Sequence, residues 1–340
     1  MSKNSILITG GAGYVGSVLT KKLVEQNFDV TVLDSLIFGN DGISELITKD
    51  SIKLLNFDLR DTSKLQNSLD DIDYVIHLAA IVGEPLCKKI PIAARQINEF
   101  ATKNLINTCK SHNIKKFFFA STCSNYGSST EIVNEESPLQ PLSLYSECKV
   151  NSEKFLLNKN SEKFETCILR FATAHGLSPR MRFDLLLQEF LRDALVDHKI
   201  TIFGQDFWRP LVHVQDMTDA CILAINGNTE QIAGQVYNVG DSAENYTKIS
   251  LAKTIQKFLP STEIEIIQSK NDPRNYKVSF EKIKNNLNFS AKKTVEDSLK
   301  EILAKVNSGN LDPKDSEFSN ISKLTENVKT FENYNFDESL

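Results

Sequence analysis

A glycine-rich turn directly after the first apolar run constrains this chain more than any other feature. Residues 5–9 are typical of a β-strand, and the run GGAGYVG follows at residues 10–16, opening an amphipathic segment over residues 14–26. In such a strand–turn–helix unit, Gly10 permits the tight turn, Gly13 lets the backbone approach a pyrophosphate, and Gly16 allows close packing of the helix on the strand. The unpaired amides at the start of the helix attract the anion. We therefore predict a dinucleotide site that includes Gly10, Gly13, Tyr14, Val15 and Gly16.

Acidic residues at two strand ends indicate which dinucleotide binds. The second predicted strand ends in Asp34, whose carboxylate would accept hydrogen bonds from the adenosine ribose and repel a 2′-phosphate. Neither Ser35 nor Leu36 supplies a compensating cation, so NAD is favoured over NADP. Asp58, at the end of the third strand, either accepts a hydrogen bond from the adenine amino group or caps the strand end. Further cofactor contacts are expected from Leu59 and from the strand-end residues Leu78, Ala79 and Ala80.

The first half of the chain alternates short β-branched or aromatic runs with longer amphipathic segments, as in βαβ units. The predicted strands are Ser5 to Thr9, Asp29 to Asp34, Ile52 to Asp58, Tyr74 to Leu78, Lys116 to Ser121 and Thr166 to Phe171. The predicted helical segments are Tyr14 to Gln26, Asp61 to Leu69, Pro91 to Ser111 and Tyr145 to Lys159. Continuous apolar runs such as residues 117–120 suit strands covered on both faces. We predict the α/β class, with a doubly wound parallel Rossmann sheet and a smaller α+β C-terminal substrate lobe.

The alternation weakens after residue 176, where prolines separate shorter elements. We therefore expect an NAD-binding Rossmann domain over residues 1–175 and a substrate lobe over residues 176–307. Residues 235–238 resemble another core strand, which could return to the main sheet. The last segment, residues 308–340, is polar and weakly periodic, and we interpret it as a surface arm.

Composition excludes several classes of protein. The formal net charge is -5 and no basic stripe is present, which argues against nucleic acid as a partner. The six cysteines form no CxxC pair and no zinc-ligand spacing with the five histidines, so we expect no metal and a cytoplasmic location. The N-terminus lacks the pattern of a secretory signal, and no apolar run approaches the roughly 20 residues that span a bilayer.

A tyrosine and a lysine four residues apart form the candidate chemical centre. On a helix, Tyr145 and Lys149 share one face. A free tyrosine ionises only near about pH 10, but a neighbouring ammonium favours the phenolate, which can then take a hydroxyl proton as hydride leaves carbon. The hydroxyl-rich run STCSNYG, residues 121–127, ends the fifth strand at the sheet edge where open α/β sheets bind ligands.

Together these motifs resemble the extended short-chain dehydrogenase/reductases of the nucleotide-sugar epimerase and dehydratase family. The resemblance covers roughly residues 5–300, through TGGAGYVG, FDLRD, HLAA, STCSNYG, YSECK, RFATAHG and WRPLVHVQD. It implies an NAD-dependent enzyme acting on a nucleotide sugar. It also implies Thr122 as the hydroxyl partner, Tyr145 as catalytic base and acid, Lys149 as the nicotinamide-ribose ligand, and Asn98 as a cofactor-side residue. Relatives usually dimerise through the helices that begin here near Pro91 and Tyr145, so we expect a homodimer.

The resemblance extends to the substrate side of the site. Thr173 stands where many relatives have an Asn that touches the sugar diphosphate, and Arg209 matches the family arginine near the nucleotide phosphates. Arg274 is either a second diphosphate ligand or a solvated surface arginine, and Phe203 either flanks the base or belongs to the core. The expected substrate-binding residues are Thr122, Thr173, Arg182, Phe203, Arg209 and Arg274.

The reaction is narrowed by the residues after Thr122. Relatives that remove water across C5 and C6 have Asp-Glu there, whereas this chain has Cys123 and Ser124, so a 4,6-dehydratase is disfavoured. Cys123 is either an acid or base toward a keto sugar, as in related epimerase/reductases, or a small buried residue. The same two readings apply to His175, which either borders the sugar or is hydrogen-bonded in the core.

What remains is hydride abstraction at a sugar carbon, expected to be C4, by a 4-epimerase or a 4-dehydrogenase. The resemblance of residues 178–184 suggests bacterial capsule or lipopolysaccharide sugar pathways. Alternatives are a 4,6-dehydratase, a keto-sugar epimerase/reductase, and a non-catalytic NAD-binding regulator that keeps the fold.

Overall fold

Seven parallel strands form the central sheet of the protein, whose computed structural model describes residues 4–268, 274–325 and 328–336. The strand order is β11-β7-β5-β4-β1-β2-β3. The chain therefore winds outward in both directions from β1 and β4, and a ligand site is expected at this switch point. The strands are β1 (Ser5–Thr9), β2 (Asp29–Asp34), β3 (Lys53–Asn56), β4 (Tyr74–His77), β5 (Lys116–Thr122), β7 (Glu165–Phe171) and β11 (Gln235–Val239).

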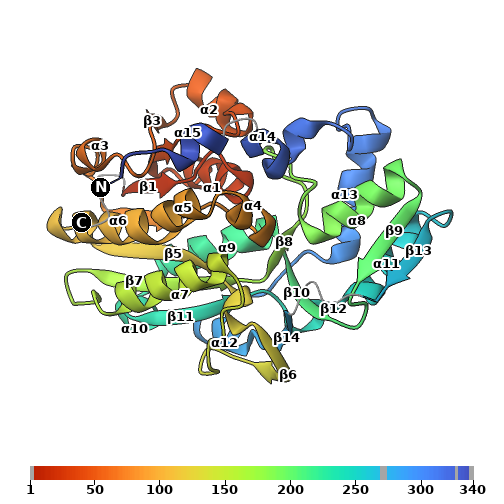
Figure 1. Cartoon of the computed structure of the whole chain (residues 1–340). Helices are drawn as coiled ribbons and strands as arrows, with labels where there is room; N and C mark the ends of the chain where they lie inside the picture. Colours follow the sequence, from red (N-terminus) through yellow and green to blue (C-terminus); the bar gives the residue numbers. More distant parts are fainter. Residues whose placement is uncertain (1–3, 269–273, 326–327, 337–340) are drawn as a thin grey trace.

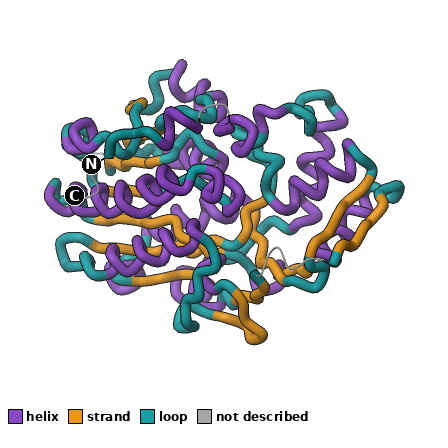
Figure 2. Tube along the Cα trace, viewed as in Figure 1, coloured by secondary structure: helices purple, strands orange, loops and turns teal. Residues whose placement is uncertain are grey.

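Helices cover both faces of this sheet (Figures 1 and 2). Successive side chains of a strand point to opposite faces: Ile6 and Ile8 pack in a cluster with α1 and α9, whereas Leu7 packs in a cluster with α6 and α7. All three side chains are fully buried. The flanking helices are α1 (Tyr14–Glu25), α2 (Ser44–Thr48), α3 (Thr62–Gln66), α4 (Glu84–Lys89), α5 (Pro91–Arg95), α6 (Thr102–Ser111), α7 (Leu144–Leu157), α9 (Val214–Asn226), α10 (Thr229–Ile232) and α12 (Glu281–Leu287).

The predicted α/β class with a doubly wound parallel sheet is confirmed. Two strands, β1 and β2, have the predicted bounds, whereas the third is three residues shorter than predicted. The long helix predicted over residues 91–111 contains a π-helical segment at Gln96–Ala101 between α5 and α6. Within that segment the Asn98 side chain bonds both backbone groups of Ile81: Oδ1 accepts its N–H at 2.8 Å, and Nδ2 donates to its carbonyl oxygen at 2.9 Å.

A smaller lobe lies beyond the carboxyl edge of the sheet (Figure 1). It has its own core, in which Leu191 of α8, Ile202 of β9, Ile255 of α11 and Ile302 of α13 are fully buried. Its elements, with the short strands that join it to the main sheet, are β6 (Ser128–Val133), β8 (Thr173–His175), α8 (Leu186–Val196), β9 (Lys199–Phe203), β10 (Trp208–His213), β12 (Asn245–Thr247), α11 (Lys248–Phe258), β13 (Glu263–Ile267), β14 (Asn275–Val278) and α13 (Val295–Asn307).

The chain between the two lobes crosses more than once. Strand β11 pairs in parallel with β7 at the edge of the main sheet, although it follows β8 and β9 in sequence. The division into a cofactor domain at residues 1–175 and a substrate lobe at residues 176–307 therefore remains a proposal. Strand β11 and helix α9 lie in the second range of the sequence but pack with the main sheet. Among the described residues, no helix has the length and apolar character needed to cross a membrane.

The C-terminal segment, predicted to be a polar surface arm, is anchored to the rest of the protein by a few buried side chains. From the end of α13 it crosses to the Rossmann sheet, where α14 (Asn320–Thr325) and α15 (Val328–Glu332) lie beside α4 and α5 (Figure 1). Leu324, Phe331 and Phe336 are buried there. These few, widely spaced apolar side chains anchor a segment whose composition is otherwise polar, which is why periodicity did not reveal the packing.

Candidate active site

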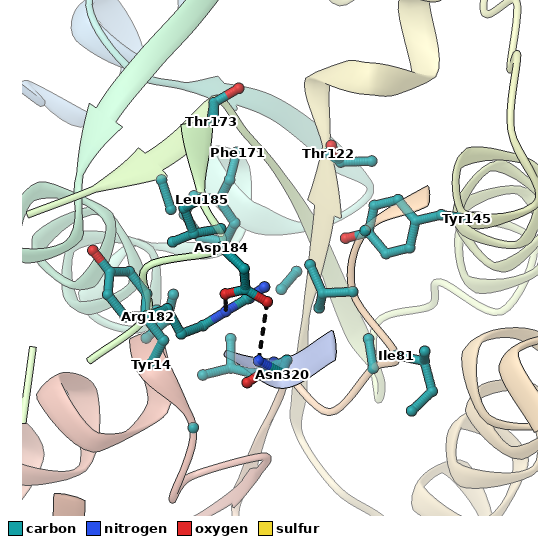
Figure 3. A pocket seen from close by; sticks show the side chains of 18 of the residues that line it. Tyr14, Ile81, Thr122, Tyr145, Phe171, Thr173, Arg182, Asp184, Leu185 and Asn320 are labelled. Atoms are coloured by element: carbon teal, nitrogen blue, oxygen red, sulfur yellow. Dashed lines mark hydrogen bonds and ion pairs between the residues drawn. The ribbon is translucent and has the colours of Figure 1, made fainter. Parts of the chain in front are cut away.

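A single cavity of about 650 Å³ runs along the carboxyl edge of the main sheet and into the smaller lobe. Its wall includes Gly10 of the glycine-rich turn at one end and Arg274 of the smaller lobe at the other. Tyr145 lies between them, with its hydroxyl pointing into the cavity on the side of Thr122 (Figure 3). The dinucleotide motif and the candidate chemical centre thus line the same cavity.

The glycine-rich turn has the geometry that a bound pyrophosphate requires. Gly10 has a φ of +74°, which side chains rarely tolerate, and a Cβ on Gly16 would lie 2.0 Å from the Gly10 carbonyl oxygen. A Cβ on Gly13 would meet only that same oxygen, at 3.3 Å, so Gly13 leaves space in the cavity wall. Tyr14 and Val15 also line the cavity, but the Tyr14 hydroxyl is already bonded, donating to the Gly176 carbonyl oxygen at 2.6 Å.

Both predicted acidic residues line the cavity. The Asp34 carboxylate accepts the N–H of Ala12 at 3.0 Å and that of Leu36 at 2.9 Å. Burial raises the pKa of Asp34, while these two hydrogen bonds and the Arg180 charge partly offset the rise. Asp58 pairs with Arg60, whose Nε and Nη2 donate to its two carboxylate oxygens at 3.0 and 2.9 Å. The other predicted cofactor contacts in the wall are Leu59, Leu78, Ala79 and Ala80.

Thr122, Tyr145 and Lys149 all line the same part of the cavity. Lys149 is 2% exposed, and its Nζ donates to the carbonyl oxygen of Ala120 at 2.8 Å. Burial lowers the pKa of Lys149 to about 8 and raises that of Tyr145. The Thr122 hydroxyl lies 2.9 Å from the hydroxyl of Ser124, another residue of the cavity wall.

The helix that carries Tyr145 is fixed at its start and in its middle. Ser143 precedes α7 and forms a capping box with Ser146, which satisfies two amide groups at the helix start. Further along, Glu153 is buried and accepts hydrogen bonds from Arg170 of β7 and from Ser121 and Asn125. This network joins the helix to the carboxyl ends of β5 and β7, so Tyr145 and Thr122 are held by one rigid frame.

The predicted substrate-side residues also line the cavity: Thr173, Arg182, Phe203, Arg209 and Arg274. Arg209 is 5% exposed, and its Nη1 donates to the carbonyl oxygens of Trp208 and Arg274 at 2.7 and 2.6 Å. Arg182 forms a buried ion pair with Asp184, at 2.8 Å between Nε and Oδ1 (Figure 3). Arg209 and Arg274 thus lie together, whereas Arg182 lies beside Tyr14 of the glycine-rich turn (Figure 3).

Two predicted site residues do not line the cavity. Cys123 is buried in the core, where its Sγ donates to the Arg170 carbonyl oxygen at 3.2 Å, which does not favour the predicted catalytic role. The short helix that starts after Thr122 turns this side chain inward. Asn98 is fully buried and holds Ile81, which itself lines the cavity, so it positions part of the wall. His175 also lies outside, with Nδ1 2.7 Å from Ser298 Oγ.

Sequence reasoning missed several residues of the wall. Arg180 and Asp184 lie in the run of residues 178–184, whose resemblance to relatives is a sequence signal but assigns no role to these two side chains. Asn320 lies in the C-terminal segment and carried no signal at all. In the part of the chain that the structure describes, no group of three or more His, Cys, Asp or Glu side chains is placed to hold a metal ion.

Three features of the cavity wall suit a bound NAD. The turn at residues 10–16 forms a cradle that a Cβ on Gly16 would close. Beside it, the Nη2 atom of Arg180 is buried without a hydrogen-bond partner, as expected for a donor reserved for an anion. Asp34 ends β2 at the position suited to ribose hydroxyls.

Comparisons with known proteins agree with this site. The profile of the NAD dependent epimerase/dehydratase family matches residues 6–240. The UDP-glucose 4-epimerase of Halalkalibacterium halodurans is 32% identical over 258 residues, which cover 70% of this chain and 75% of that protein. The UDP-glucose 4-epimerase of Lactobacillus helveticus is 29% identical over 274 residues, covering 74% and 81%.

Solved structures share the fold. Pal from Bacillus thuringiensis superposes with a TM-score of 0.81 at 23% identity, covering 89% of this chain and 99% of that one. UDP-glucose 4-epimerase from Thermotoga maritima, solved with UDP-glucose, gives a TM-score of 0.79 at 24% identity, covering 90% and 99%. By its profile match and its relatives, this chain belongs to the NAD-dependent epimerase/dehydratase family of extended short-chain dehydrogenase/reductases, and its cofactor is NAD.

Proposed function

We propose that the protein catalyses NAD-dependent oxidation and reduction of a nucleoside-diphosphate sugar at C4, as a 4-epimerase or a 4-dehydrogenase. The observation that carries the proposal is the continuity of one cavity from the glycine-rich turn, past Thr122, Tyr145 and Lys149, to Arg209 and Arg274. Support comes from relatives described as UDP-glucose 4-epimerases.

The protein's own groups supply the proton transfer. When bound, NAD supplies reversible hydride acceptance at the carbon that is oxidised. The Tyr145 oxygen takes the hydroxyl proton of the sugar, and the Thr122 hydroxyl holds the same sugar oxygen. Because burial raises the pKa of Tyr145, the phenol needs a cation to act as a base, and Lys149 Nζ lies 5.9 Å from its ring centre.

Arginine side chains at the far end suit a diphosphate. The guanidinium of Arg209 is nearly buried, and Arg274 lies beside it, with its carbonyl oxygen 2.6 Å from Arg209 Nη1. Planar guanidinium groups bind phosphate oxygens with two parallel hydrogen bonds, which fixes orientation as well as position. A sugar held between this end and the glycine-rich turn would reach Tyr145 with its reacting carbon near the cofactor.

The residues after Thr122 favour simple oxidation over dehydration. Cys123 faces the core, and Ser124 lines the cavity with a hydroxyl bonded to Thr122. Neither supplies the acid and base that would protonate a leaving hydroxyl and remove the C5 proton. We therefore favour a 4-epimerase or 4-dehydrogenase over a 4,6-dehydratase and over a keto-sugar epimerase/reductase.

The proposal is tested by incubating the purified protein with UDP-, GDP-, CDP- and dTDP-sugars while following sugar products and reduced nicotinamide. A sugar isomer without net reduced cofactor identifies an epimerase, whereas stoichiometric reduced cofactor and a keto sugar identify a dehydrogenase. Tyr145→Phe should abolish either result, and Tyr74→Phe, a matched change outside the cavity wall, should not. If no sugar reacts and Tyr145→Phe leaves the biological function unchanged, the protein is a non-catalytic NAD-binding regulator.

We further propose a cytoplasmic homodimer that serves bacterial capsule or lipopolysaccharide sugar synthesis. All six cysteines are free and buried, which suits a reducing compartment. The outer faces of α5 to α7 share a charged network in which Glu99 bonds Arg95, Lys103 and Asn151, beside the exposed Ile92. Light scattering that showed a monomer at micromolar concentration would refute the dimer.

A further inference from the structure

Two buried polar atoms in the cavity wall have no hydrogen-bond partner within the protein. They are the Nη2 donor of Arg180, a residue that is 6% exposed, and the Oδ1 acceptor of Asn320, which is 8% exposed. Of the seven such side-chain atoms among the described residues, only these two belong to residues that line the cavity. Buried polar groups are nearly always bonded in native proteins, so a donor and an acceptor left open on a cavity wall indicate a ligand.

Arg180 lies beside the glycine-rich turn rather than at the sugar end. Its segment is tied to α1, because the Ser178 hydroxyl donates to the Tyr14 carbonyl oxygen at 2.7 Å and lies 3.2 Å from the Ser17 hydroxyl. The guanidinium carbon lies 5.0 Å from the ring centre of Phe38, which follows β2. Nη1 donates to the carbonyl oxygen of Met181 at 2.9 Å, leaving Nη2 as the open donor.

Asn320 is held in the wall by the segment that carries Asp184. Its backbone N–H donates to Asp184 Oδ2 at 3.0 Å, and Asp184 is the partner of Arg182. Figure 3 shows Asn320 between Tyr14 and Ile81, with Asp184 directly beside it. Just before it, the Phe318 carbonyl oxygen accepts the N–H of Phe183 at 2.8 Å, which fastens this part of the chain to the smaller lobe.

The other end of the same segment is fastened to the cofactor domain through Arg60. The guanidinium of Arg60 lies 4.1 Å from the ring centre of Tyr334 and 5.3 Å from that of Phe331, and its Nη1 donates to the Phe331 carbonyl oxygen at 3.0 Å. The same guanidinium pairs with Asp58 in the cavity wall. We name residues 308–325 and 328–336 the C-terminal strap, since they contact both lobes.

We propose that Arg180 binds the diphosphate of NAD, that Asn320 accepts a hydrogen bond from a ribose hydroxyl of NAD, and that the C-terminal strap thereby retains the cofactor. A guanidinium matches phosphate oxygens, and an amide oxygen accepts from a hydroxyl. Release of the cofactor then requires the strap to move, because Asn320 is buried and bonded to Asp184. The proposal concerns cofactor binding and holds for epimerisation and net oxidation alike.

The test measures binding and not turnover. Protein freed of nucleotide is titrated with NAD, ADP-ribose and adenosine by calorimetry, and NAD release is timed by chase with excess ADP-ribose. Arg180→Met should weaken binding of NAD and ADP-ribose between about ten- and hundredfold and leave adenosine unchanged. Asn320→Ala should speed NAD release by about tenfold. Arg180→Lys, which keeps the charge without the fork, should fall between wild type and Arg180→Met.

The control is Lys314→Ala, an exposed change on the same strap, which should bind and release NAD as wild type does. Melting curves establish that each variant is folded before its affinity is compared. Wild-type affinity and release in folded Arg180→Met and Asn320→Ala would overturn the proposal. If Arg180→Met lost equal affinity for adenosine and for ADP-ribose, the proposal would also be overturned, because adenosine has no diphosphate for Arg180 to bind.

Discussion

The Nζ atom of Lys149 lies 5.9 Å from the centre of the Tyr145 ring, and in the cavity wall Lys149 is buried and Tyr145 is partly buried. Burial lowers the pKa of Lys149 to about 8 and raises that of Tyr145. The ammonium group of Lys149 can favour the Tyr145 phenolate only while it is charged, that is, below about pH 8. The form with a charged Lys149 is therefore the one in which Tyr145 can accept the sugar's hydroxyl proton.

We therefore expect the rate of the oxidation step to fall as the pH rises through about 8, where Lys149 loses its charge. The measurement is a single-turnover mixing experiment that follows reduced nicotinamide at a series of pH values. Tyr145→Phe should be inactive throughout the series. A rate independent of pH across this range would show that the charge of Lys149 does not govern proton transfer.

Lys149 should lower the stability of the folded protein at neutral pH. Its folded-state pKa of about 8 lies below the ordinary value of 10.5, so the unfolded chain binds more protons between these two pH values. Stability from this group therefore rises with pH across that window, and the full penalty, on the order of 3 kcal/mol, applies below it. Lys149→Met should be more stable than wild type at neutral pH and lose this advantage near pH 10.5.

Urea unfolding at the two ends of that window measures the difference. Lys300→Met removes an exposed lysine and should show no such change with pH. If Lys149→Met were the less stable protein at neutral pH, the hydrogen bond from Nζ to Ala120 would outweigh the desolvation of the ammonium group.

Two glycines of the same turn should respond differently to alanine. A Cβ on Gly16 would lie 2.0 Å from the Gly10 carbonyl oxygen and 2.7 Å from the Gly11 Cα, so Gly16→Ala must distort the turn and lower stability. A Cβ on Gly13 meets only one atom, at 3.3 Å, and projects into the cavity wall. Gly13→Ala should therefore fold normally and bind NAD at least about tenfold more weakly.

Thermal melting and NAD titration of both variants separate the two effects. Reduced melting temperature confined to Gly16→Ala, with NAD affinity lowered in both, is the expected pattern. Unchanged NAD affinity in a folded Gly13→Ala variant would place the pyrophosphate elsewhere.

The cofactor half of the site could be predicted because its residues are adjacent in sequence and their spacing maps directly onto a strand, a turn and a helix. Arg180 and Asn320 could not be assigned in this way, since only long-range packing brings them to the same wall. The packing of the C-terminal strap could not be predicted because its anchors, such as Leu324 and Phe331, are isolated in a polar segment. Sequence motifs predict structure within a short segment, whereas the residues that complete the cavity wall are brought together only by the whole fold.

Cys123 illustrates the same limit at a single position. Its place after Thr122 made it a candidate acid or base, but the structure turns the thiol into the core, where burial raises its pKa well above the ordinary value. Cys123→Ala should therefore keep sugar turnover within about twofold of wild type. It should lower stability by about 1 kcal/mol through the small cavity left behind.

The matched control is Cys221→Ala, which removes an equally buried thiol from the same core cluster, away from the cavity. Both variants should show similar melting temperatures and similar rates on the sugar that the protein converts. A loss of more than about tenfold in Cys123→Ala alone, with melting matched to the control, would give the thiol a role in proton transfer. The keto-sugar epimerase/reductase would then explain the reaction better, because its chemistry uses a cysteine as acid or base. The hydrogen bond from Sγ to the Arg170 carbonyl oxygen would have to break during turnover.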